Sequence, residues 1–388
     1  MSKQEIRLFI SKDGMMVVDD PSPLEMAILN RLGIRLNENH YSSYCGRVSP
    51  KYRLIRDYRI PLPLPRGHKS LLSIHNEKVR EALSGEDSVF DYGYNLFDLK
   101  RSLLKRFLKR CCLCGYRCKG KRAVAGECPM GRPSYYHQHF IHVGEEKEIG
   151  RTLVIELTGC NMRCKFCQKG ELIKIEDVGV SPFTPALWED LKREYQQEEF
   201  NSISFLGGNP DQSLLAVLDF LEHAPDWASH LSIVWHTNGY SSPELYMLLW
   251  GLVDIWVFDF KYFNNNCALY LSQAPNYKET AMSALEAICN TNAFSPVIVR
   301  HLILPGHWDC CQRPLIKYLS QHLKDRVIFH PMGQYLPLWR VTSEDKEMNR
   351  CISLKEIIQV LDYTNKSGLI VTSSGYPEIQ RGKECTRS

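Results

Sequence analysis

The chain from about residue 150 onward alternates short apolar runs with helical patterns. Six of the runs have the length and composition of β-strands: TLVIEL, SISFLGG, LSIVWHTNG, DIWVFDFK, PVIVRHLILPG and RVIFHPM. Amphipathic stretches such as LWEDLKREYQQEEF and SLLAVLDFLEHA lie between them. Strands that alternate with helices are typical of a parallel sheet with crossover helices. We therefore expect an α/β fold in which residues 150–388 form a partial or complete parallel β/α barrel with a C-terminal extension.

Glycine and polar residues gather where these predicted strands end. The strand-end sequences are TGC, GGNP, HTNG, DFK, LPG and HPMGQ. In β/α barrels the chemistry collects at the C-terminal ends of the strands. The sequence therefore predicts a functional site at this end of the barrel.

The chain before residue 150 has a different character. We expect residues 1–105 to form an N-terminal α+β accessory domain that could recognise a substrate or a partner. Its patterns are EIRLFISKDGMMVVDD (strand, turn, strand), PSPLEMAILNRLG (helix) and NLFDLKRSLLKRFLKRC (helix). We expect residues 106–149 to form a small Cys-rich metal-binding module, CCLCGYRCKGKRAVAGEC, followed by a linker that contains YYHQHFIH.

Composition limits the compartment and the partners. The 388 residues are 44% hydrophobic and 24% charged, which is typical of a soluble globular protein. The sequence contains neither the ~18–20-residue apolar run of a membrane span nor a signal-peptide pattern at its start. We therefore expect a cytoplasmic protein without a membrane partner. The net charge of +4 neither demands nor excludes nucleic acid. In the cytosol, 15 cysteines indicate metal binding or catalysis rather than a disulfide framework.

Three cysteines fall within eight residues directly after the first predicted barrel strand. These are Cys160, Cys164 and Cys167 in the stretch ELTGCNMRCKFCQK. Thiolates are soft ligands that suit iron–sulfur clusters, zinc or Cu(I). A cubane cluster normally takes four cysteines, so three leave one iron open. An open coordination position lets a metal site admit a substrate.

The spacing C-x3-C-x2-C, with Phe166 before the last cysteine, resembles the signature of the radical S-adenosylmethionine (SAM) superfamily. The Gly207-Gly208-Asn209-Pro210 turn is similar to the GGEP turn of that family, which meets the amino group of the bound methionine. Asn stands here where Glu is common, and its amide oxygen can still accept from an ammonium group. The resemblance also implies that Phe166 packs near the adenine, although an aromatic ring there could simply fill the core.

Later strand ends resemble motifs of glycyl-radical-enzyme activases. Thr237 and Asn238 begin a TNG motif, and Asp259 and Lys261 frame a DFK motif that could equally be an ordinary ion pair. The stretch RHLILPG resembles a strand whose arginine, here Arg300, approaches the methionine carboxylate. His236 departs from the activases, which tend to carry Asp there. Over residues 111–380 the chain is most similar to uncharacterised proteins described as pyruvate formate-lyase activating enzyme-like, with which it shares an HxGEE-type segment, 142–146.

The resemblance implies a mechanism and a cofactor set. A [4Fe–4S] cluster on Cys160, Cys164 and Cys167 would chelate SAM and reduce it to methionine and a 5′-deoxyadenosyl radical, which abstracts a hydrogen atom. Such oxidoreductase or activase-like chemistry needs a cellular one-electron donor of the flavodoxin or ferredoxin type. The cofactors carry the reaction, and the protein binds, orients and excludes water.

A second set of cysteines lies before the barrel. Four thiols are the number for a closed site, and either zinc or an auxiliary [4Fe–4S] cluster could occupy it. The four are Cys111, Cys114, Cys118 and Cys128. We favour the cluster. Histidines 137, 139 and 142 are expected on the surface or in packing rather than as ligands. The scattered cysteines 267, 289, 310, 311, 351 and 385 are expected to be ordinary thiols.

Three functions remain open from the sequence. The first is an autonomous radical enzyme that acts on a peptide, a cofactor precursor or a small metabolite. The second is an activating enzyme that installs a glycyl radical on a partner enzyme. The third is a zinc-stapled nucleic-acid-binding module, which leaves the strand-end motifs unexplained. The N-terminal extension and the four-cysteine module favour the first, and the sequence does not name the substrate.

Overall fold

The computed structural model describes residues 9–10, 16–17, 50–60, 64, 67–85, 93–119, 128, 130–143, 146, 148–173, 179–291 and 295–372. Strands β1 (Phe9–Ile10) and β2 (Met16–Val17) pair antiparallel, as the strand–turn–strand pattern predicted. The helix predicted over residues 21–33 lies outside the described residues. Of the helices that the structure describes, none is long and apolar enough to cross a membrane.

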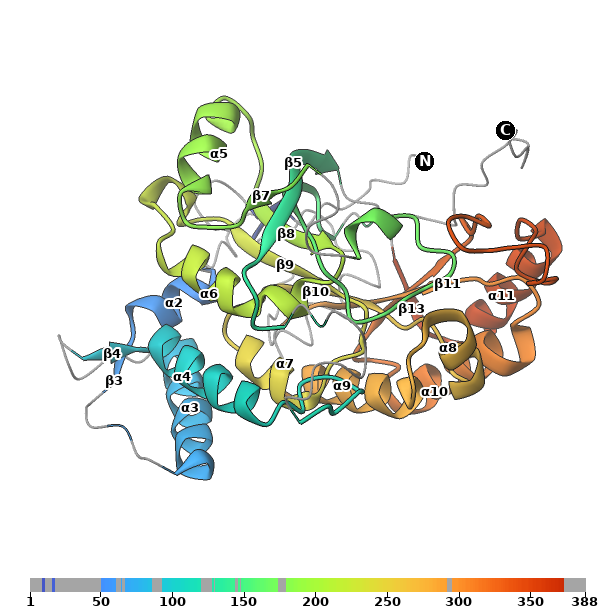
Figure 1. The fold of residues 1–388 in the computed structure, drawn as a ribbon, viewed down its shortest axis with the longest axis horizontal. Coiled ribbons are helices and arrows are strands. Elements are labelled where there is room, and N and C mark those ends of the chain that lie inside the picture. The colour runs from blue at the N-terminus through green and yellow to red at the C-terminus, as the bar shows by residue number, and fades with distance from the viewer. Residues whose placement is uncertain are drawn as a thin grey trace, which may run out of the picture.

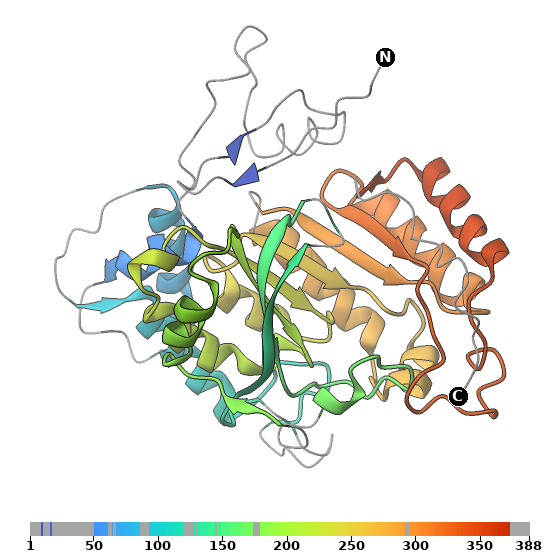
Figure 2. The same ribbon diagram turned by 90° about the horizontal axis from the view of Figure 1, so that it is seen from above.

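A nine-stranded sheet with parallel strands at its centre organises the fold, and it contains all six strands predicted from the sequence. These are β6 (Arg151–Leu157), β8 (Ser202–Gly207), β9 (Ser232–Thr237), β10 (Ile255–Asp259), β11 (Val297–Leu302) and β12 (Ile328–Met332). The strand order is β13-β12-β11-β10-β9-β8-β6-β5-β7, with β13 at Ile370–Val371. Within the described residues this order ends at β13 and β7, so the barrel is partial (Figure 2).

One edge of the sheet differs from the prediction. The segment expected to be a linker is a nine-residue strand, β5 (Tyr135–Val143), which runs antiparallel to β6. It also pairs with the short strand β7 (Ser181–Pro182). Most β5 side chains are half-buried on both faces, so the segment lacks the clean apolar–polar alternation that marks a strand in sequence. Its aromatic and β-branched residues nonetheless favour a strand.

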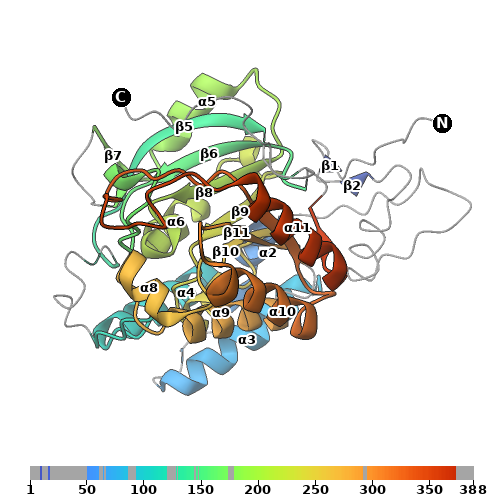
Figure 3. The same ribbon diagram turned by 90° about the vertical axis from the view of Figure 1, so that its right-hand side faces the viewer.

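Helices alternate with the parallel strands and cover one face of the sheet (Figures 1 and 3). They are α5 (Leu187–Tyr195), α6 (Leu214–Glu222), α7 (Pro243–Leu249), α8 (Asn265–Ser272), α9 (Tyr277–Thr291), α10 (Arg313–His322) and α11 (Leu354–Ser367). The main hydrophobic core includes strand residues such as Trp235, Trp256 and Phe329. A separate aliphatic cluster contains Val234 and Val257. Because neighbouring strand positions fall in different clusters, the two faces of the sheet are clearly distinguished.

Three helices from the first part of the chain pack against the barrel. They are α2 (Lys51–Asp57), α3 (His68–Leu83) and α4 (Leu96–Lys109), beside the two-stranded β3 (Arg59–Ile60) and β4 (Tyr94–Asn95). Helix α4 was predicted, and a capping box of Asn95 and Asp98 sets its start. Lys100 Nζ, fully buried, donates to the carbonyl oxygens of Leu248 (3.0 Å) and Trp250 (2.7 Å). The helices therefore share the hydrophobic core of the barrel.

Candidate functional site

The inner face of the sheet, which carries the separate aliphatic cluster, changes from apolar to ionisable along its strands. Aliphatic residues come first: Val234, Val257, Ile298 and Ile328. Two positions further along the same four strands come His236, Asp259, Arg300 and His330. Side chains two residues apart in a strand lie on the same face. The ionisable groups therefore gather toward the C-terminal ends of the strands, where the sequence predicted the site.

A buried carboxylate that the sequence reading assigned no role organises this polar region. Glu146 lies between β5 and β6, is fully buried, and accepts from Arg300 Nε (2.6 Å) and Nη2 (2.5 Å). It also contacts His330 Nδ1 at 2.6 Å. Burial opposes ionisation of Glu146, but hydrogen bonds from His330 and Arg300 outweigh it and lower its pKa. Arg300 is thus held bidentately in one orientation. The shared HxGEE-type segment was the one available signal for Glu146.

His236 places a buried ring nitrogen without a described hydrogen-bond partner on the inner face. Within the described part of the chain its buried Nε2 has no hydrogen-bond partner. Burial, and then the charge of Arg300, lower the pKa of His236 to about 3. The imidazole is therefore neutral near pH 7. Buried polar groups are almost always paired, so this orphan nitrogen is a candidate contact for a bound molecule.

The three cysteines that follow β6 lie together. Cys160 and Cys164 are buried and Cys167 is half-buried. Burial and then the neighbouring Cys164 raise the pKa of Cys160 to about 11 and that of Cys167 to about 12. The thiolate charges of the loop therefore disfavour one another, and a bound cation removes that repulsion. The loop therefore suits a positively charged iron–sulfur or metal group.

Hydrogen-bond donors point at two of these sulfurs. Ser272 Oγ, at the end of α8, donates to Cys164 Sγ at 3.0 Å. Asn238 Nδ2 lies 3.6 Å from Cys160 Sγ, and the backbone N–H of Met162 lies 3.4 Å from it. Hydrogen bonds to ligand sulfurs tune the potential of an iron–sulfur cluster. Asn238 belongs to the predicted site, whereas Ser272 was not predicted.

The glycine turn after β8 is in direct backbone contact with the cysteine loop. Gly208 N donates to Leu157 O and Asn209 N to Gly159 O, each at 2.8 Å. A Cβ on Gly207, which has φ +115°, or on Gly208 would collide with these same carbonyl groups. These bonds join residues 51 and 50 positions apart in sequence, so the turn and the loop form one structural unit.

The same unit includes the strand end after β9. The backbone N–H of Asn238 donates to Asn209 Oδ1 at 3.2 Å. Thr237 Oγ1 donates to the buried Asp211, one residue beyond Pro210, at 2.8 Å. The structure therefore brings together the TNG and GGNP motifs that the sequence analysis singled out. Asp211 was not predicted.

The remaining predicted residues make contacts with other protein groups. Lys261 Nζ and Asp259 Oδ2 form an ion pair at 2.7 Å. Burial alone would lower the pKa of Lys261, but the charge of Asp259 raises it. The ring of Phe166 is buried and meets Tyr262 and Tyr335 edge-on. An aromatic core role for Phe166 is consistent with this packing.

The Cys-rich module docks beside the TNG motif. The backbones of Cys114 and Ser241 form an isolated antiparallel β-bridge, and Ser242 N donates to Leu113 O at 3.0 Å. Burial, followed by smaller contributions that include the other cysteines of the set, raises the pKa of Cys111 to about 11 and that of Cys114 to about 12. Cys118 and Cys128 are among the groups that raise both pKa values.

The possible ligand atoms of these two cysteine sets do not form a close group of the kind that holds a single metal ion. In the part of the chain that the structure describes, neither set brings three donor atoms within 4.8 Å of one another. Zn–S bonds of about 2.3 Å would place tetrahedral ligand sulfurs about 3.8 Å apart. The histidines of β5 join no such group either, and His139 Nδ1 instead contacts Tyr195 Oη at 2.9 Å.

Comparisons with known proteins agree with this geometry. The radical SAM superfamily domain matches residues 154–318. The uncharacterized protein MJ0674 of Methanocaldococcus jannaschii is 31% identical over 311 residues, which cover 77% of this chain and 88% of that protein.

Solved structures show weaker similarity. A radical SAM methyltransferase from Sphaerobacter thermophilus has 13% identity and a TM-score of 0.43 over 78% of this chain and 92% of its own. QueE from Escherichia coli has 13% identity and a TM-score of 0.38 over 62% and 93%. TM-scores this low do not bear on the reaction. On the domain match and the archaeal relative, the chain belongs to the radical SAM superfamily, whose enzymes use a [4Fe–4S] cluster and S-adenosylmethionine.

Proposed function

We propose that this radical SAM enzyme holds its catalytic cluster on Cys160, Cys164 and Cys167 and abstracts a hydrogen atom from a peptide, a cofactor precursor or a small metabolite. When bound, the cluster and SAM supply the reductive cleavage that produces methionine and the 5′-deoxyadenosyl radical. The observation that carries the proposal is the backbone contact between the cysteine loop and the Gly207–Pro210 turn. It puts the cluster ligands beside the turn that would receive the amino group of methionine.

The chain's own residues bind and orient the cofactor in this proposal. Asn209 offers its amide oxygen to the ammonium group, and Arg300, oriented by Glu146, offers its charge to the carboxylate. His236 is neutral and supplies a hydrogen-bonding nitrogen that needs no proton at pH 7. Asn238 and Ser272 stabilise the ligand sulfurs. Phe166 and its aromatic neighbours exclude water from the loop.

The segment after β12 favours an autonomous enzyme over an activase. Asp345 binds Lys165 of the cysteine loop at 2.6 Å, and Arg340 N donates to Lys165 O at 2.8 Å. Trp339 packs so closely on Gly170 that a Cβ there would clash. A chain segment tied to the cluster loop narrows the access that a folded partner's glycyl loop would need. The activating enzyme stays the alternative, because the strand-end motifs resemble those of glycyl-radical-enzyme activases.

The second cysteine set would hold its own metal group, and the enzyme would work in the cytoplasm. Four thiols in one short stretch can close a site of their own, and we assign Cys111, Cys114, Cys118 and Cys128 to an auxiliary [4Fe–4S] cluster in preference to a zinc ion. We place the enzyme in the cytoplasm, where a flavodoxin- or ferredoxin-type protein would donate the electron. Membership of an enzyme family favours both enzyme hypotheses over a nucleic-acid-binding module.

Anaerobic cofactor cleavage tests the proposal. Reconstituted protein with dithionite and SAM should release 5′-deoxyadenosine slowly without substrate, and the Cys160→Ala/Cys164→Ala/Cys167→Ala variant should release none. Cleavage by the triple variant would disprove the cluster assignment. Candidate short peptides and glycyl radical enzymes are then added separately. Stoichiometric loss of hydrogen from a peptide supports the first function, and a glycyl radical signal in the added enzyme supports the activase.

A further inference from the structure

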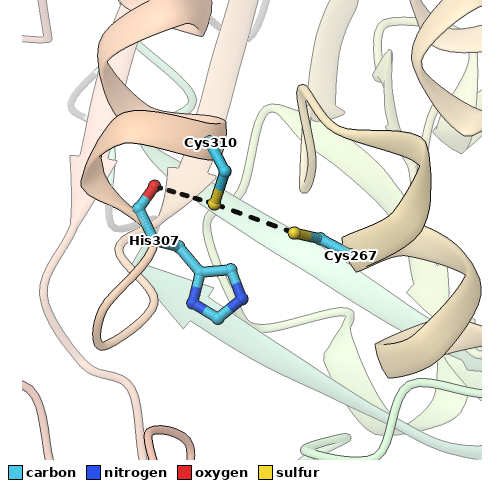
Figure 4. Close-up of side chains that lie close together, drawn as sticks. All are labelled: Cys267, His307 and Cys310. Atoms are coloured by element: carbon cyan, nitrogen blue, oxygen red, sulfur yellow. Dashed lines mark hydrogen bonds between the residues drawn. The ribbon is translucent and has the colours of Figure 1, made fainter.

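A third group of soft ligands lies away from both cysteine sets. Cys267 comes from α8, and His307 and Cys310 come from the segment that joins β11 to α10. One donor atom from each residue lies within 4.8 Å of the other two, and all three residues are half-buried. Figure 4 shows Cys267 on one helix, with Cys310 on the facing helical turn (Trp308–Gln312) and His307 just before that turn. The sequence analysis had treated both cysteines as ordinary thiols.

The sulfur separation matches metal coordination. Cys267 Sγ and Cys310 Sγ are 3.7 Å apart. Tetrahedral zinc with Zn–S bonds of about 2.3 Å sets its sulfurs about 3.8 Å apart, whereas a disulfide requires about 2.05 Å. The two thiols, hydrogen-bonded to each other in Figure 4, are therefore spaced for a shared ion and are not joined by a disulfide.

His307 is prepared as a ligand by its own backbone. Its Nδ1 lies 2.7 Å from Pro305 O. A carbonyl oxygen can only accept, so Nδ1 carries the proton and Nε2 keeps its lone pair. Metal-binding histidines commonly donate their other ring N–H to a carbonyl in this way, which fixes the tautomer and the ring orientation.

A further free thiol follows the group directly. Cys311 comes next to Cys310 in sequence and is fully buried. The thiolate is the form that binds metal, so a bound ion would displace the protons of the thiols that hold it.

We propose that Cys267, His307 and Cys310 bind a zinc ion, with the fourth position filled by the adjacent Cys311 thiol or by water. Two thiolates and an imidazole are a ligand set typical of Zn²⁺, and they converge from two separate elements. The site is independent of the catalytic cluster and of the Cys111–Cys128 set, and its occupancy can be measured without turnover.

The ion would connect α8 to the loop after β11. The C-terminal end of α8 in turn supports the cluster loop: Ser272 O accepts from Arg163 N at 2.9 Å, and Leu271 O accepts from Lys165 N at 2.8 Å. A metal that fixes α8 therefore stabilises the loop that carries Cys160 and Cys164. This structural role deepens the proposed function without depending on its substrate.

Metal analysis of the full-length chain tests the site. Protein purified anaerobically from zinc-supplemented medium is compared with Cys267→Ser/Cys310→Ser and with the control Cys289→Ser, which removes a buried thiol from α9. We expect the double variant to lose about one zinc per chain, with iron content and far-UV spectrum retained, and the control to lose none. Equal zinc in wild type and double variant would overturn the proposal. So would loss of iron in place of zinc, or a Cys267–Cys310 disulfide in the anaerobic protein.

A milder variant covers the case in which the double variant does not fold. His307→Gln leaves both thiols and removes one ligand. Transfer of zinc to a chromogenic chelator should then be more than about tenfold faster than from wild type. Zinc release at the wild-type rate would remove His307 from the site and overturn the three-ligand assignment.

Discussion

At the scale of single residues, the polar site depends on one buried carboxylate. Glu146 takes two hydrogen bonds from Arg300 and one contact from His330, and the three groups come from three different segments of the chain. A buried charge is stable only when it is paired and hydrogen-bonded. The pair therefore fixes the guanidinium of Arg300 on the inner face before any ligand binds.

Arg300→Ala should weaken SAM binding much more than cluster content. The substitution removes the charge proposed for the methionine carboxylate and leaves Glu146 buried without its main partner. Losing the pair between Arg300 and the methionine carboxylate should cost about 2–5 kcal/mol of binding free energy, or roughly thirtyfold or more in affinity for SAM. Equilibrium binding of SAM to the reconstituted protein measures the effect. Arg151→Ala, at the exposed start of β6, is the matched control. Unchanged SAM affinity in Arg300→Ala would remove Arg300 from the site.

Glu146 should also make the free energy of unfolding decrease as the pH falls into the acid range. Its pKa in the folded protein is lowered by His330 and Arg300 against the opposing effect of burial. Its contribution is therefore fully present above the unfolded pKa of about 4.3 and is lost as the pH falls toward the folded value. Urea unfolding between about pH 7 and pH 3.5 should show Glu146→Gln less stable at neutral pH, with a shallower decline in acid. Parallel pH profiles for the two proteins would contradict this role.

At the scale of elements, α8 links two sites. Its end supplies the Ser272 hydroxyl to Cys164 Sγ and two backbone carbonyls to the cluster loop, and its start carries Cys267. Asn264 caps the helix by accepting from Asn266 N and Cys267 N. The helix is only eight residues long, and helices this short owe most of their stability to such outside contacts.

Ser272→Ala should make the catalytic cluster harder to reduce. A hydrogen bond to a ligand sulfur stabilises the extra negative charge of the reduced state. Removing one of about 1 kcal/mol should lower the potential by tens of millivolts. Anaerobic redox titration by EPR measures the shift. Ser202→Ala, whose buried hydroxyl has no partner among the described residues, is the control and should leave the potential unchanged. A potential equal to that of wild type would show that the Ser272 bond does not act on the cluster.

At the scale of the whole molecule, the Cys-rich module and the N-terminal helices pack against the barrel. The Cys-rich module meets the strand end after β9, and helices α2–α4 share the barrel's hydrophobic core. Tyr52 Oη donates to Ala228 O at 2.9 Å, which adds a polar anchor to the apolar contact. The first part of the chain is therefore expected to contribute to the stability of the barrel as well as to recognition.

The Cys160→Ala/Cys164→Ala/Cys167→Ala variant should retain metal at the Cys111–Cys128 module. Four thiols there can close a site without borrowing from the catalytic three. We expect about four irons with matching sulfide per chain, in addition to the zinc proposed at Cys267. Iron and sulfide analysis measures the content of the triple variant. Further replacement of Cys111 and Cys114 should remove the iron and the sulfide. A triple variant without iron or sulfide would contradict an auxiliary cluster.

Lys100→Ala should destabilise the whole fold. Lys100 Nζ satisfies two buried carbonyl oxygens and contacts His75 Nε2 at 2.8 Å. Each of the two buried acceptors left unsatisfied costs about 1–3 kcal/mol, so the free energy of unfolding should fall by about 2–6 kcal/mol. The exposed Lys105→Ala on the same helix is the control. A melting temperature equal to that of wild type would show that α4 does not anchor to the barrel through Lys100.

The sequence by itself determined the parts of this protein that depend on local order along the chain. Alternation of apolar runs and helical patterns predicted all six central strands, because burial on a parallel sheet imposes that pattern on each segment separately. The cysteine spacing, the glycine turn and the TNG motif likewise lie within a few residues each. Their order along the chain was enough to indicate a radical SAM enzyme, which the domain match confirmed.

Only the tertiary structure decided which distant groups meet. Strand β5 was not predicted because its pairing with β6, rather than an alternating pattern of its own, holds it in the sheet. Glu146 and Arg300 are 154 residues apart, and Cys267 and Cys310 are 43 apart. A side-chain contact over such separations leaves no periodic trace in sequence, because it depends on how strands and helices are placed by the packing of the entire core.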